Sequence, residues 1–206
     1  FQAQSALDAV VMTSGVLRGI AVSLHKVAND IRFLGSGPRA GVGELTLPEV
    51  QPGSSIMPGK VNPVIAESLI QVTAHVIGND LAVVLAGQGG YFELNTMMPV
   101  AAYNLLQSIG LLSTACQNFA VQCVTGLSAT DVGPSMVEKG LMLGTALAPA
   151  IVYDRASQIA KEAAASGATI REVTRQRTSL PEEEISRLLD PQKMTEPGLD
   201  GGLAGG

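Results

Sequence analysis

The sequence predicts an all-α protein in which a bundle of long helices is followed by a small C-terminal α domain. From about residue 3 to residue 34, apolar residues recur at mixed spacings of three and four, the period of an amphipathic helix. Charged residues are scarce between Val61 and Thr130 and become frequent after Asp131. Glycine and proline gather in connections between the periodic stretches, so each long stretch is expected to form one helix.

Composition and charge exclude several classes of partner. The chain has 206 residues, and its hydrophobic content of 46% is ample for a core. The 13 basic and 18 acidic residues give a formal net charge of -5 without a basic run, so nucleic acid and membrane are not expected partners. Polar residues interrupt every apolar segment, no signal peptide is visible, and we expect a cytoplasmic protein. Cys116 and Cys123 are seven positions apart on an expected helix, too far for a disulfide, and are expected to be buried free thiols.

The first helix is expected to span residues 3–34 and to end at Gly35, Gly37 and Pro38. Its first residues lack an initiator Met and an N-cap, which indicates that the chain is part of a longer protein. A long connection rich in glycine and proline then runs from Gly35 to Asn62. Connections of this length are usually functional or disordered.

Two further helices are expected at residues 63–86 and 99–126. Between Val61 and Thr130, the formally charged residues are Glu67, Asp80 and Glu93. Helices of roughly 35 to 45 Å with so little charge must be covered on nearly every face. Identical helices from other subunits would supply that cover, so the sequence predicts a homo-oligomer.

The predicted domains are residues 1–129 for the helical bundle and 130–196 for the small α domain, with a disordered tail at 197–206. After Asp131 an ordinary charged surface returns on shorter segments. The last helix is expected to start at Pro181, where three glutamates suit the helix dipole, and to stop by Pro191. The glycine-rich tail lacks the apolar residues that a packed structure needs.

The segment Gly53–Pro63, "GSSIMPGKVNP", carries the most informative polar groups of the chain. Asn62 as N-cap and Pro63 as first helical residue predict a helix N-terminus, whose free N–H groups form an anion site. Lys60 adds a full positive charge, so the segment is suited to hold a carboxylate and to stabilise further negative charge that develops on it.

Ser54 or Ser55 could act on a neighbouring proton of such a ligand. A serine hydroxyl is a weak base, so this role needs nearby hydrogen-bond donors and a positive environment. Gly53 and Gly59 allow backbone N–H groups to approach closely. From composition alone, a mobile surface loop with a solvated lysine remains the alternative.

The segment resembles the signature loop G-S-S-x-M-P-x-K-x-N-P of the fumarase/aspartase superfamily. Gly59 and Val61 resemble class II fumarases, because aspartases usually carry Ala before the lysine, while argininosuccinate and adenylosuccinate lyases follow it with Lys or Arg. The stretches Asn29–Glu49, Gly90–Asn95 ("GYFELN") and "LLDPQKMTEP" near the end also look like class II fumarase. Polypeptides of this family are much longer, so the chain resembles their C-terminal half.

This resemblance implies fumarate hydratase activity, the reversible hydration of fumarate to L-malate in the tricarboxylic acid cycle. In the family, a proton is removed from the carbon next to a carboxylate to give an aci-carboxylate, and hydroxide is then expelled. No metal or organic cofactor is implied. The family's active sites are shared between subunits of a homotetramer built around long helices.

Residue by residue, the resemblance makes Ser54 the catalytic base and makes Lys60 and Asn62 carboxylate-binding residues. Ser55, next to Ser54, is also expected to bind substrate. The resemblance makes Glu67 a residue that organises the active-site histidine and water, and we expect its carboxylate to be buried and to face the loop. An ordinary interaction with the helix dipole is the alternative for Glu67.

The family's catalytic histidine belongs to the N-terminal half of the enzyme, so this chain is expected to be inactive alone. His25 and His75 match no catalytic position. Two other functions stay open, an aspartase-type ammonia lyase and a non-catalytic helical assembly fragment. The intact set of signature-loop residues argues against the second.

Overall fold

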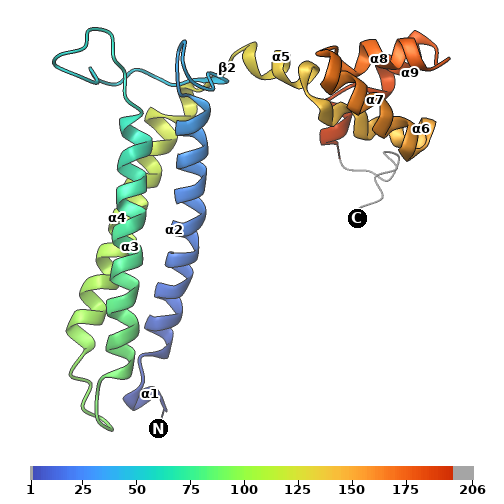
Figure 1. Cartoon of the computed structure of the whole chain (residues 1–206). Coiled ribbons are helices and arrows are strands. Elements are labelled where there is room, and N and C mark those ends of the chain that lie inside the picture. Colours follow the sequence, from blue (N-terminus) through green and yellow to red (C-terminus); the bar gives the residue numbers. More distant parts are fainter. Residues whose placement is uncertain (1, 197–206) are drawn as a thin grey trace. The chain divides into compact units, whose positions relative to one another are not determined.

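The computed structural model describes residues 2–196, and the predicted tail at 197–206 lies outside them. The chain divides into two compact units between Thr130 and Asp131. Nearly all regular structure is helical (Figure 1), so the all-α prediction is confirmed. Each unit is described by itself.

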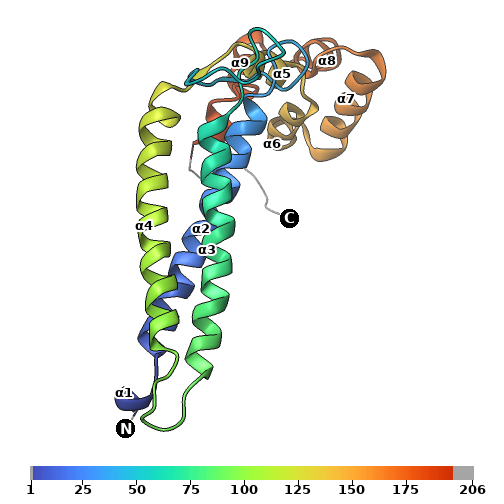
Figure 2. The same cartoon turned by 90° about the vertical axis from the view of Figure 1, so that its left-hand side faces the viewer.

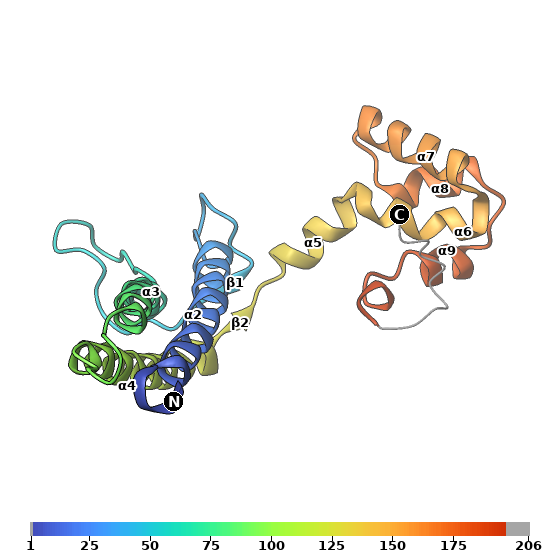
Figure 3. The ribbon, with the colours of Figure 1, turned by 90° about the horizontal axis from the view of Figure 1, so that it is seen from below.

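Unit 1 is built on three long helices, α2 (Asp8–Leu34), α3 (Val64–Gln88) and α4 (Met98–Gln122). They run side by side in two perpendicular views (Figures 1 and 2) and stand as a cluster when seen end-on (Figure 3). The expected first helix is interrupted, because a short α1 (Gln2–Ser5) precedes α2. The expected third helix ends earlier, since η1 (Val124–Gly126) is a separate 3-10 turn.

Small side chains and a heptad-like spacing pack these helices. The buried positions of α3 follow alternating steps of three and four, at Ala66, Leu69, Thr73, Val76, Asp80 and Val83. The facing positions of α2 are seven residues apart, at Ser14, Ala21 and Ala28. This spacing is that of a coiled-coil seam, and small residues along it let the helices approach closely.

Polar side chains tie α3 to both neighbours. The Asp80 side chain is 4% exposed, and its carboxylate accepts hydrogen bonds from Ser14 Oγ at 2.7 Å and from Arg18 Nη1 at 2.8 Å. On the other side of α3, Asn79 Nδ2 donates to Ser108 Oγ on α4 at 3.2 Å. Apolar contacts tolerate sliding, whereas hydrogen bonds depend on distance and angle, so these pairs fix the register of the helices.

The two histidines take part in contacts between helices. His25 Nδ1 lies 2.9 Å from Thr73 Oγ1, and His75 Nε2 lies 2.8 Å from Gln107 Oε1. Both cysteines are free thiols, but Cys116 is only half-buried, which corrects the expectation that both are buried. Burial raises the pKa of the Cys123 thiol.

By length and composition, α2 and α3 are apolar enough to cross a membrane, with 18-residue windows of mean hydropathy 1.2 and 1.5. The sequence predicts no such segment, because polar residues interrupt each apolar run. Core helices meet the same criterion, and 39% of the α3 window is already buried inside unit 1.

A two-stranded antiparallel pair, absent from the sequence expectations, divides the connection between α2 and α3. β1 (Leu45–Thr46) pairs with β2 (Ser128–Ala129), with Leu45 opposite Ala129. Thr130 extends this link, since its N–H donates to Glu44 O at 3.0 Å. The strands join the middle of the connection to the segment that follows α4, leaving a loop on either side of β1.

Large apolar side chains remain exposed along all three long helices. They include Met12 and Val16 on α2, Leu81 and Leu85 on α3, and Tyr103 and Leu106 on α4. Apolar surface of this extent on one unit is typical of an interface.

Unit 2 is a cluster of short helices around its own core. Its elements are α5 (Val132–Lys139), η2 (Leu141–Leu147), α6 (Ala148–Ile151), α7 (Tyr153–Ser166), α8 (Ile170–Arg177), α9 (Glu182–Leu188) and η3 (Lys193–Thr195). Nine buried residues form the core: Leu143, Leu147, Ala156, Ile159, Ala163, Ile170, Val173, Ile185 and Leu189. Pro181 is the N-cap of α9, so the last helix begins one residue later than expected.

Candidate active site

The segment 53–62 is a closed loop at the start of α3. Gly53 N–H donates to Lys60 O at 2.7 Å, and Asn62 Nδ2 donates to Gly53 O at 2.9 Å. These two bonds hold both ends of the loop together, so its conformation is set mainly by its own residues.

Two positions of the motif require glycine, each for a different structural reason. A Cβ on Gly53 would lie 2.7 Å from Lys60 O, so any larger residue would force the closing bond apart. Gly59 has a φ of +76°, in the left-handed region that favours glycine. The turn there lets the next residue, Lys60, accept the hydrogen bond from Gly53 N–H. The glycine-containing segment 53–62 is therefore folded into a defined loop.

Backbone N–H groups of the loop point at the Ser54 hydroxyl. The Ser54 Oγ accepts hydrogen bonds from the N–H groups of Ile56 and Met57, each at 3.1 Å. Hydrogen bonds to an oxygen favour its negatively charged form, so these donors lower the cost of removing the Ser54 proton. This is the environment that a serine base requires, and the side chain is only half-buried and remains accessible.

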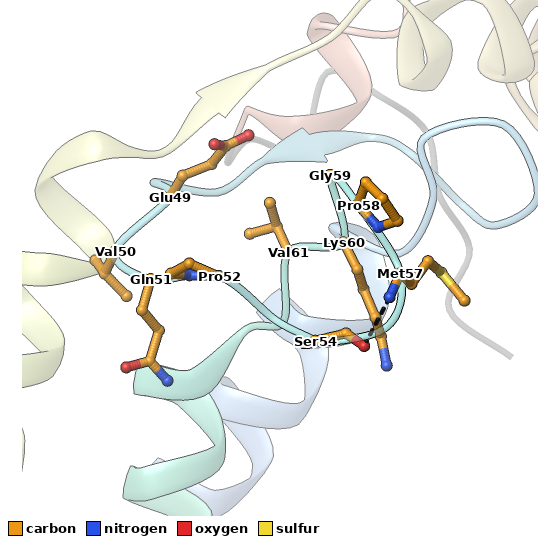
Figure 4. A pocket seen from close by; sticks show the side chains of 10 residues that line it. All are labelled: Glu49, Val50, Gln51, Pro52, Ser54, Met57, Pro58, Gly59, Lys60 and Val61. Atoms are coloured by element: carbon orange, nitrogen blue, oxygen red, sulfur yellow. Dashed lines mark hydrogen bonds between the residues drawn. The ribbon is translucent and has the colours of Figure 1, made fainter.

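Ser54 and Lys60 line one cleft of about 530 Å³, here called the loop cleft. Figure 4 shows both side chains on the same side of the loop. The remaining lining residues are Glu49, Val50, Gln51, Pro52, Met57, Pro58, Gly59 and Val61. The basic residues of α2 pair with carboxylates, through Arg18–Asp80, Lys26–Asp30 and Arg32–Glu67, whereas Lys60 has no ion-pair partner within residues 2–196. Its ammonium is available to an anion.

The other three expected site residues do not line the loop cleft. Ser55 is exposed on the loop. Asn62 lines a separate cavity of only about 10 Å³ beside Pro63 and Val64. The prediction that Asn62 caps the helix is wrong: Pro63 is the N-cap, no side chain caps the first turn, and the Asn62 amide closes the loop instead.

Glu67 lies on the first turn of α3, as expected, but its carboxylate faces α2. Its Oε1 is 3.5 Å from Arg32 Nε, and its side chain is 35% exposed, so the expected burial is wrong. Arg32 lies in the last turn of α2, and the ends of two antiparallel neighbouring helices meet. That proximity was a signal from which the partner could have been predicted.

Glu49 and Gln51 line the loop cleft as well, although neither has a role in the site predicted from the sequence. They precede the recognised motif, and only the turn of the chain after β1 brings them to it. Among residues 2–196, no group of three or more His, Cys, Asp or Glu side chains is arranged to hold a metal ion.

Two protein-family models match parts of this chain. Residues 1–78 match the family described as "Lyase", and residues 143–196 match the family described as "Fumarase C C-terminus". A class II fumarate hydratase of Rickettsia bellii is 52% identical over 196 residues, which are 94% of this chain and 42% of that protein.

Solved structures give the same result. A fumarate lyase:delta crystallin structure from Brucella melitensis, bound to cobalt, is 49% identical with a TM-score of 0.86, over 95% of this chain and 43% of that one. A class II fumarase of Schistosoma mansoni is 36% identical with a TM-score of 0.88, over 96% of this chain and 41% of that one.

The chain belongs to the class II fumarase family of the fumarase/aspartase superfamily. It spans less than half the length of the curated relatives that it matches, for example 42% of a class II fumarate hydratase of Bradyrhizobium diazoefficiens.

Proposed function

We propose that this chain supplies part of the active site of a fumarate hydratase, which interconverts fumarate and L-malate. Supporting this proposal, Ser54 Oγ accepts two backbone N–H bonds in a cleft that also contains the unpaired Lys60. A deprotonated serine beside a cation suits the removal of a proton next to a carboxylate.

In the direction of malate dehydration, Ser54 takes the proton from the carbon next to one carboxylate of L-malate. The electron pair of that C–H bond moves into the carboxylate and gives a doubly charged aci-carboxylate. Lys60 stabilises this added charge, and Ser55 and Asn62 contribute to substrate binding. As the double bond of fumarate forms, hydroxide leaves with the C–O electron pair and takes up a proton to become water. Glu67 organises the histidine and water around this leaving group.

The remaining groups come from outside this chain. We propose that the N-terminal half of the same enzyme supplies the histidine, and that four copies assemble through the exposed apolar faces of α2, α3 and α4. The assembly acts in the cytoplasm on fumarate and L-malate without a metal or organic cofactor. In support, the long helices of unit 1 expose large apolar side chains that other copies would cover.

The test uses the full-length enzyme with Ser54→Ala and Lys60→Met. Loss of the base should lower kcat for fumarate hydration by about a hundredfold to ten-thousandfold. Loss of the ammonium should raise KM for dicarboxylates, because it removes an anchoring charge. The matched controls on α2, Ser23→Ala and Lys26→Met, should keep wild-type kinetics. Near-normal hydration in both site variants would contradict the proposal.

Two further assays separate the alternatives. Ammonia release from L-aspartate without fumarate hydration would identify an aspartase-type lyase. The chain alone should be inactive, because proton removal and hydroxide departure need groups from both halves. Malate formation by the purified chain would contradict that division of the site.

A further inference from the structure

Glu49 stands on the wall of the loop cleft across from the reactive groups. It lines the cleft, and in Figure 4 its carboxylate lies on the opposite side of the opening from the Ser54 hydroxyl and the Lys60 ammonium. The backbone that precedes Glu49 is held in place, because Pro48 packs closely on Gly126. A Cβ on Gly126 would lie 2.5 Å from the Pro48 Cγ. The Glu49 side chain itself is exposed.

The cleft contains one positive and one negative side chain. Lys60 is the only basic residue and Glu49 the only acidic residue among those that line it. No ion pair joins them within the described part of the chain, although three other pairs in unit 1 neutralise Asp80, Asp30 and Glu67. Glu49 is thus an exposed negative charge among the residues that line the cleft.

A dicarboxylate held at Lys60 shares the cleft with this charge. One unit charge at roughly 8 Å changes the affinity of a second by about threefold when water screens the pair, and by about thirtyfold at the lower dielectric of a closed site. The penalty grows with the ligand's charge, so a dianion is affected more than a monoanion. Salt screens the effect while the cleft is open.

We propose that Glu49 is a specificity-determining residue that weakens the hold of the cleft on dianions. This inference rests on the proposed function, in which substrate and product both carry two negative charges. A site with only cations would bind both tightly and release them slowly, and uniform binding of this kind gives no gain in turnover. Glu49 offsets part of the attraction to Lys60 and favours release in either direction.

The experiment compares Glu49→Gln with Glu44→Gln in the full-length, assembled enzyme. Glu44 belongs to the same connection but does not line the cleft. The probes are succinate, a saturated dicarboxylate, and butyrate, a monocarboxylate of similar size, each titrated at low and at high salt. Glu49→Gln should tighten succinate binding by about threefold to thirtyfold. Butyrate should gain less, the gain should shrink with salt, and Glu44→Gln should match the wild type.

Steady-state kinetics add a second readout. KM for fumarate and for L-malate should both fall in Glu49→Gln, whereas a merely structural role would raise them or lower kcat alone. Unchanged or weaker succinate binding in Glu49→Gln, in an enzyme whose wild type hydrates fumarate, would overturn this inference and leave the proposed function standing. A wild-type enzyme without fumarate hydration would instead overturn the proposed function.

Discussion

The two units of this chain bury their apolar residues in opposite ways. Unit 2 gathers leucine, isoleucine and valine from short helices into a closed core and covers it with ion pairs such as Arg171–Glu138 and Arg177–Glu162. Unit 1 buries mainly small residues along helix seams and leaves large apolar side chains on its surface. One unit completes its own core, while the other presents surface that further helices would cover.

This difference separates a unit that packs around its own core from a unit that keeps apolar surface exposed. The short helices of unit 2 have the amphipathic pattern that lets them pack without a partner. The seams of unit 1 depend on a few directional pairs, chiefly around Asp80, for their alignment. The loop cleft lies at one end of these helices, so whatever fixes the helices also fixes Ser54 and Lys60.

The largest expected effect is in the core of unit 2. Leu147 is 0% exposed, so Leu147→Ala should lower the free energy of unfolding of this unit by about 3 kcal/mol, through lost burial and the remaining cavity. Urea denaturation with residue-specific hydrogen exchange measures it. The matched control is Leu81→Ala on α3, 61% exposed, which should weaken self-association while leaving the exchange protection of unit 2 unchanged.

A smaller loss is expected at the polar pair that aligns α2 with α3. Asp80→Ala removes the acceptor of two hydrogen bonds and should destabilise unit 1 by about 2 kcal/mol, since bonds to a charged group are stronger than neutral ones. Asp30→Ala, which removes an exposed pair with Lys26 on α2, should cost less than about 0.5 kcal/mol. Equal losses in thermal unfolding would show that Asp80 does not align the helices.

An effect of opposite sign is expected at the start of α7. Val152 has a φ of +69°, a conformation that strains a β-branched residue. Val152→Gly should relieve the strain and stabilise unit 2 by about 1 kcal/mol after the entropic cost of glycine. Val152→Ala keeps the Cβ and should give little of this gain. A lower Tm for the glycine variant would show that the strain is compensated by contacts.

The smallest effect concerns pH and the surface of unit 2. The hydrogen bond from Arg177 holds the pKa of Glu162 below its ordinary value of 4.5, and the bond from Arg175 does the same for Glu182. A depressed folded-state pKa contributes stability above the unfolded value, and this is lost as the pH falls through the folded value. Stability of unit 2 should therefore decline below about pH 4.5, less steeply in Glu162→Gln. Identical pH profiles of Tm would rule out a contribution from this pair.

The sequence predicted the fold better than it predicted the site. Residue spacing located the three long helices to within a few residues, because helical periodicity is a local property. The strand pair was missed, because its partners Leu45 and Ala129 are far apart in the sequence and each strand is only two residues long. Length and hydrophobicity alone gave no signal for so short a ladder.

Of the predicted site residues, Ser54 and Lys60 line the same cleft, whereas Ser55, Asn62 and Glu67 lie elsewhere. The motif named the residue types that the loop needs, but the partners of each depended on how the chain turns. Asn62 closes the loop instead of capping α3, because its amide reaches Gly53 O.

By itself, the sequence determined an all-α chain with a charge-poor helical part, a charged C-terminal part and a lyase-type loop, because periodicity, charge and motif are all read along neighbouring residues. Only the tertiary structure decided that two backbone N–H groups meet Ser54 Oγ, that Glu67 pairs with Arg32, and that Glu49 lines the loop cleft. Such contacts depend on where each turn points a side chain. A shift of one helical position rotates a side chain by about 100°, which spacing along the chain does not fix across a loop.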